Sequence, residues 1–138
     1  MKSFSLVPQS EGSRREFKIT LGLRAGYGPK GRIYDLEEAL RAAHGWMRDR
    51  AAHGQPFLSG MFTRGEVVYA GSVDDAASDR EPVAIFAGEV LPLYAGELSD
   101  EAVRELLNEL ACEMGRVLEQ EEVHVAYRDR TWTLAVGF

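Results

Sequence analysis

The chain has 138 residues, 45% hydrophobic and 28% charged, proportions typical of one globular domain that buries a core of its own. Its net charge of -6 and isoelectric point near 5.1 argue against nucleic acid and anionic membranes as partners, because both would repel it. A single cysteine, Cys112, excludes an intramolecular disulfide and a cysteine-based zinc site, and with no apolar run long enough for a signal peptide or a membrane span we expect a soluble cytoplasmic protein.

The first sixteen residues are polar apart from a short alternation at Phe4 and Leu6, and they include the pair Arg14 and Arg15. This composition is typical of a flexible arm or an added edge strand. We therefore divide the chain into an N-terminal arm, residues 1–16, and a single folded domain, residues 17–138.

The domain opens with a strand and a helix. Apolar residues alternate with polar or small ones over residues 17–24, which predicts a strand with one buried face. A loop rich in glycine follows at 25–32, and Asp35 is a suitable N-cap for a helix over 35–52. Gly54 and Pro56 are typical of the end of that helix.

The middle of the chain predicts strands at 57–62 and 66–70, with Arg64 and Gly65 forming either a hairpin turn or a bulge in one long strand. Residues 71–81 are small, polar and mostly acidic, which indicates a mobile loop. The strand predicted at 83–90 is almost continuously apolar, as expected of a central strand.

The last third predicts a helix and two more strands. Ser99 and the acids Asp100 and Glu101 mark a helix start, and an apolar stripe continues at helical spacing to Leu118. Strands follow at 123–127 and 131–136. The resulting order predicts an α+β fold, a ferredoxin-like split βαβ sandwich (βαββαβ) with an extra edge strand or hairpin, in which two helices cover one face of an antiparallel sheet.

Such a sheet leaves its other face, the open face, without helices. Its expected residues mix small side chains with cationic or titratable ones, which suits either the packing of a second sheet in a dimer or a shallow ligand cavity. We expect the open face to carry Lys18, Thr20, Gly22, Arg24, Ala84, Phe86, Gly88, Val90, His124, Ala126 and Arg128.

The glycine-rich loop precedes a helix N-terminus and carries Lys30 and Arg32, a combination that can bind a phosphate or carboxylate, although glycines also serve simply to turn the chain. The three histidines lack metal-ligand spacing, so we expect no metal site. His124, which projects from a strand toward the open face, is a candidate for proton transfer, although a surface or dimer-contact histidine explains it as well.

The sequence favours non-catalytic binding of a small anionic or nucleotide-like ligand by a homo-oligomer, a dimer or higher, without a cofactor. One alternative is a dimeric α+β-barrel enzyme acting on a small molecule, with His124 as general base and Arg24 stabilising an oxyanion. Another is an acidic interaction or inhibitor protein that presents residues 71–81 or 101–113 to a basic partner. The predicted ligand-binding residues are Arg24, Tyr27, Lys30, Arg32, Tyr34, His124 and Arg128.

Overall fold

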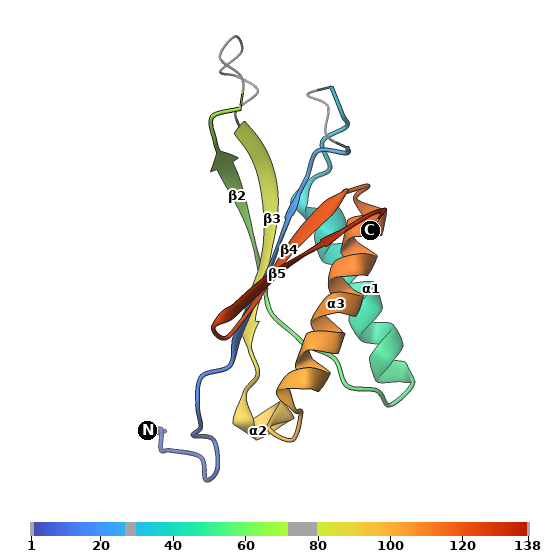
Figure 1. Ribbon diagram of the computed structural model, residues 1–138. Coiled ribbons are helices and arrows are strands. Elements are labelled where there is room, and N and C mark those ends of the chain that lie inside the picture. The colour runs from blue at the N-terminus through green and yellow to red at the C-terminus, as the bar shows by residue number, and fades with distance from the viewer. Residues whose placement is uncertain (1, 27–29, 72–79, 138) are drawn as a thin grey trace.

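A computed structural model describes residues 2–26, 30–71 and 80–137. Its five strands form one sheet in the order β2-β3-β1-β4-β5, and every neighbouring pair is antiparallel. Helices α1 and α3 lie together on one face of this sheet (Figure 1). The elements are β1 (Glu16–Gly22), α1 (Leu36–Ala52), β2 (Met61–Val68), β3 (Arg80–Glu89), α2 (Pro92–Ala95), α3 (Asp100–Val117), β4 (Glu122–Tyr127) and β5 (Arg130–Ala135).

This arrangement confirms the predicted α+β fold, with β5 as the extra edge strand. The helix starts also agree with the sequence. Asp35 caps α1 and forms a capping box with Glu38, while the Ser99 hydroxyl accepts a hydrogen bond from the Ala102 amide at 3.1 Å at the start of α3. The apolar stripe of α3 is buried against the sheet, so this helix contributes the largest share of helical core residues.

Strand β2 resolves the alternatives at Arg64 and Gly65. It pairs with β3 in one unbroken register from Met61 opposite Ala87 to Val68 opposite Arg80. Arg64 and Gly65 therefore form neither a hairpin turn nor a bulge. The predicted mobile loop at 71–81 falls mostly outside the described residues, and β3 begins at Arg80, earlier than predicted.

One part of the predicted open face is wrong. Phe86 pairs with Ile19 and Ala84 with Leu21, so these β3 residues face the helices, and both are fully buried. Gly88, opposite Phe17, shares that face, and Val90 also joins the core. Strand β3 instead presents Val83, Ile85 and Ala87 to the open face. The strand is apolar on both faces, so its sequence has no alternation that shows which of its residues face the helices.

The residues before β1 lie outside any strand in the described part of the chain. The division into an arm and a domain beginning at residue 17 stays a prediction. The short helix α2, absent from the sequence prediction, begins at Pro92, whose fixed φ suits a first helical position. Among the described residues, no helix combines the length and apolar character that crossing a membrane requires.

Candidate functional site

A small cavity opens on the open face, at the end of the sheet where β1 leaves it. It has a volume of about 170 Å³ and draws its walls from β1, β2, β3, β4 and the connection between α3 and β4. Polar groups from these separate segments converge here, as in a small-molecule site. We call this the Gly22 cavity. It is lined by Thr20, Leu21, Gly22, Gly26, Val67, Glu81, Val83, Gln120, Glu121, Glu122 and His124.

Gly22 makes room for the polar side chains of this cavity. A Cβ atom at position 22 would lie 2.2 Å from the Glu81 Oε1 and 2.5 Å from the Gln120 Oε1, both far below van der Waals contact. A carboxylate from β3 and an amide from beyond α3 thus meet directly above the backbone of β1. The absence of a side chain at Gly22 is what permits this approach.

The amide of Gln120 is oriented by two backbone carbonyls. Its Nε2 donates to the Arg24 carbonyl at 2.7 Å and to the Leu118 carbonyl at 3.0 Å. The donors of this side chain are therefore engaged by the protein, and its Oε1 remains as the acceptor beside Gly22. A ligand in the cavity therefore meets the Oε1 of Gln120 rather than its Nε2.

The turn that ends α3 positions Gln120. Glu119 has a φ of 54°, the left-handed conformation that commonly ends a helix, and the Gln120 amide donates to the Gly115 carbonyl at 2.8 Å. The Tyr34 hydroxyl donates to the Glu119 carboxylate, and this hydrogen bond is the main reason that the pKa of Tyr34 is raised. The end of α3 is thereby tied to the segment that leads into α1.

The Gly22 cavity is acidic. Its described lining holds the three carboxylates of Glu81, Glu121 and Glu122 against the imidazole of His124. The His124 Nε2 lies 3.9 Å from Glu122, and its Nδ1 lies 2.9 Å from the Thr133 hydroxyl. Such a lining favours a cationic ligand over an anion. Across the described ranges, no group of three or more His, Cys, Asp or Glu side chains is placed to hold a metal ion.

The predicted cationic loop is held mainly by contacts within the protein. The Arg32 guanidinium lies 4.3 Å from the centre of the Tyr34 ring and donates to Glu38 at 2.8 Å. Tyr34 is buried, and Arg24 forms an isolated β-bridge with Ile33. Lys30 is exposed, and Tyr27 lies outside the described residues.

Two predicted ligand-binding residues, one in β4 and one in the turn after it, do not line the same cavity. His124 lines the Gly22 cavity, whereas Arg128 lies at the opposite end of β4 and donates to Asp100 at 3.3 Å. Arg128 instead lines another hollow of the open face, about 420 Å³ in volume, together with Lys18 and Met61. Of the predicted set with described positions, only His124 lines the Gly22 cavity.

Sequence reasoning missed Glu81, Gln120, Glu121 and Glu122. Glu81 belongs to a stretch that resembles a solvated acidic loop, and Gln120 and Glu121 precede β4 in a polar connection. The signal that could have found them was their position: both segments lie next to strands that flank β1 in the predicted sheet, at the end where Gly22 lies. Polar residues at neighbouring strand ends converge on one edge of a sheet.

No family model and no curated protein matches the chain. Solved structures do. A phage SAM lyase in complex with S-methyl-5'-thioadenosine superposes with a TM-score of 0.64 at 19% sequence identity, over 96% of this chain and 97% of that one. A phage SAM lyase in its apo state gives a TM-score of 0.68 at 19% identity, over 97% and 98% of the two chains.

These likenesses extend over nearly the whole chain and support the α+β fold. They also contradict the main functional prediction, because the neighbours are lyases rather than non-catalytic binding proteins. The acidic lining of the Gly22 cavity also disfavours an anionic ligand in that cavity. Of the functions considered from the sequence, the alternative of an enzyme acting on a small molecule agrees better with these neighbours.

Proposed function

We propose that the protein is an enzyme that cleaves S-adenosylmethionine and releases S-methyl-5'-thioadenosine, with the Gly22 cavity as part of its active site. The observation that carries this proposal is the likeness to phage SAM lyase along nearly the full length of both chains. Fold alone does not determine activity, so the proposal also depends on the chemistry of the cavity.

The charge of the cavity supports a cationic substrate. S-adenosylmethionine carries two positively charged groups, a sulfonium and an ammonium, and the cavity is lined by the carboxylates of Glu81, Glu121 and Glu122. In the reaction the bond from sulfur to the terminal carbon of the amino-acid chain breaks, and its electron pair goes to sulfur, which becomes a neutral thioether. An oxygen of the substrate's own carboxylate forms a bond to that carbon, which closes a lactone as the second product. A carboxylate at the sulfur would stabilise the substrate more than the transition state, so we assign these acids to the ammonium group.

We propose that the protein acts as a cytoplasmic homo-oligomer in which a second copy completes the site. The Gly22 cavity, at about 170 Å³, is smaller than the roughly 300 Å³ at which small-molecule sites begin. The open face exposes Val67 at this cavity and Met61 at the other end of β2, which are 41% and 68% accessible. A second copy over this face would bury them and add the missing wall.

The test is the release of S-methyl-5'-thioadenosine from S-adenosylmethionine, followed by liquid chromatography and mass spectrometry. We expect Glu81→Gln to lower kcat/KM roughly 10- to 100-fold, because a hydrogen bond to a charged group contributes about 1.5–3 kcal/mol. Glu105→Gln, at an exposed position of α3 that is not part of the cavity, is the matched control and should keep wild-type activity. Product formation by the wild type no faster than in a protein-free blank would refute the proposal.

A further inference from the structure

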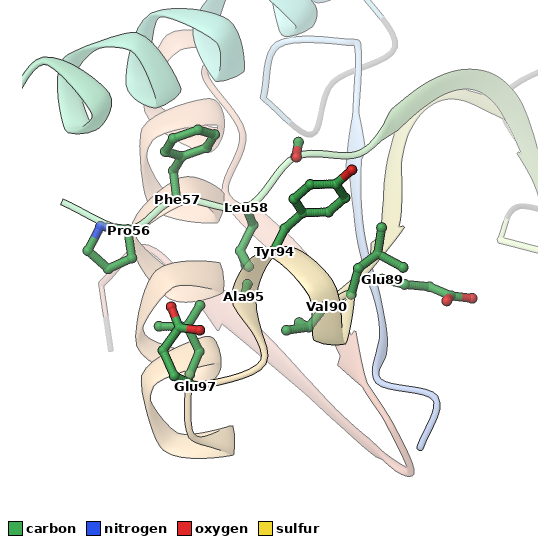
Figure 2. Close-up of a pocket in the computed structure, with 11 residues that line it drawn as sticks. Pro56, Phe57, Leu58, Glu89, Val90, Tyr94, Ala95 and Glu97 are labelled. Atoms are coloured by element: carbon green, nitrogen blue, oxygen red, sulfur yellow. The ribbon is translucent and has the colours of Figure 1, made fainter. Parts of the chain in front are cut away.

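A second cavity lies far from the Gly22 cavity, beside α2. It has a volume of about 390 Å³ and lies between residues 56–59 and the segment from Glu89 to Leu98. Figure 2 shows Phe57, Leu58, Val90 and Tyr94 around it, with Glu97 nearby. We call it the α2 cavity. Its walls are mostly apolar, and Phe57, Leu91 and Tyr94 are at least 40% accessible, so this end of the molecule offers an apolar docking surface.

The N-terminal arm carries apolar side chains that its own chain leaves exposed to solvent. Phe4 is fully exposed, and Leu6 and Val7 are largely exposed, although the residues around them are polar. Phe4 and Leu6 are spaced by two residues, as in an extended segment that presents one face to a partner. A segment of this kind is expected to bind an apolar groove.

The arm does not fill the α2 cavity of its own chain. Gly12 lies against Pro92 of α2, because a Cβ there would approach the Pro92 Cγ to 2.8 Å. Before Gly12 the chain reverses: the Ser10 amide and hydroxyl donate to the Val7 carbonyl at 3.2 Å and 2.6 Å, and Gln9 has a φ of 64°. In Figure 1 the N-terminal end and α2 lie on opposite sides of the chain that leads into β1.

We infer that residues 2–7 of one copy bind in the α2 cavity of a second copy, with Phe4 and Leu6 as the apolar anchors. Lys2 of the arm and Glu97 of the cavity carry opposite charges, which favours this docking. The base of the arm and the cavity lie at the same end of the molecule, since Gly12 contacts α2. One two-fold axis at this end therefore lets each copy receive the arm of the other.

A cysteine cross-link tests the exchange directly. In a Cys112→Ser background, Phe4→Cys and Tyr94→Cys place one thiol on the arm and one in the α2 cavity. After mild oxidation we expect a covalent dimer on a non-reducing gel, which reduction converts back to monomer. The matched control combines Phe4→Cys with Leu93→Cys, on the same helix but not in the cavity lining, and should give at most a tenth as much dimer. A disulfide within one chain, or equal dimer from the control, would overturn the inference.

A second measurement keeps the inference testable if the cysteine variants fold poorly. Phe4→Ser and Leu6→Ser together remove the apolar anchors from a segment outside every helix and strand of the described chain, so the fold should be unchanged. Sedimentation velocity over a concentration series should show association weakened at least tenfold relative to wild type. Unchanged association, or a wild type that is monomeric at all concentrations, contradicts the arm exchange.

Discussion

Gly22 shows how one residue can determine the site without belonging to the chemistry. Gly22→Ala would displace the ends of Glu81 and Gln120, which are flexible side chains rather than backbone, so the cost to folding is small. Alanine also suits this position because its φ is not in the left-handed region. We expect the midpoint of thermal unfolding to change by no more than a few degrees while kcat/KM for S-adenosylmethionine falls at least tenfold.

The control for this prediction is Gly45→Ala in α1, where an added Cβ meets nothing within 4 Å. It should leave turnover unchanged and stabilise the helix by up to about 1 kcal/mol. If Gly22→Ala retains wild-type turnover, the convergence of Glu81 and Gln120 has no part in the reaction.

The sequence was sufficient to place Gly22 on the open face, but it did not predict that Glu81 and Gln120 lie beside it. The alternation of apolar and polar residues through 17–24 is sufficient by itself to place Gly22 on the open face. The same alternation in the segment that forms β4 places His124 there. The approach of Glu81 and Gln120 depends on pairing between strands distant in sequence and on the turn at Glu119. Neither follows from hydrophobic periodicity, because the strand pairing is a tertiary constraint and the turn at Glu119 lies beyond the apolar stripe of α3.

Helix α3 is joined to the sheet at its first turn by a charged network. Asp100 accepts hydrogen bonds from the Tyr127 hydroxyl and from Arg15 at 3.1 Å, and it lies 3.3 Å from Arg128. The hydrogen bond from Tyr127 is the main reason that the pKa of Asp100 lies below its ordinary value of 3.8. A depressed pKa means that the ionised form stabilises the folded state.

The downward direction of this pKa shift determines how the stability of the fold depends on pH. Above pH about 5 the stabilisation by Asp100 is complete, and it is lost progressively as the pH falls through the ordinary pKa of 3.8 toward the depressed one. Urea unfolding should therefore show wild type more stable than Asp100→Asn at pH 7, with a difference that narrows below pH 3.8. Glu101→Gln, an exposed acid of the same turn, is the control, and a wild-type advantage that persists undiminished at pH about 2 would contradict the assignment.

Elements were predictable where a single buried face leaves a clear pattern. The stripe of α3 and the caps Asp35 and Ser99 agree with the structure because each depends on neighbours close in sequence. The prediction for β3 was wrong by one residue because both of its faces carry apolar side chains, and only its pairing with β1 determines which face Phe86 occupies. A one-residue shift exchanges the buried and open faces completely.

For the whole molecule, the open face links assembly to the proposed reaction. Val83, Ile85 and Ala87 of β3 extend an apolar strip along this face toward Met61, and the Gly22 cavity opens beside it. A second copy over the strip would exclude water from the cavity and strengthen the attraction of its carboxylates for a cation. The small residues of the open face were sufficient to suggest such packing from the sequence. The sequence does not reveal that the Gly22 cavity of one chain is smaller than an ordinary small-molecule site.

Opposite faces of β2 offer a matched pair of variants for this assembly. Met61 lies on the open face and is 68% accessible, whereas Val68 points to the other face and is 72% accessible. We expect Met61→Glu to lower the mass from light scattering to that of the arm-linked dimer or the monomer and to lower turnover with it, because a buried unpaired carboxylate is costly. Val68→Glu should keep both the oligomer and the activity. Equal behaviour of the two variants would mean that the open face is not the interface, and the wall of the Gly22 cavity would then have to come from the chain itself.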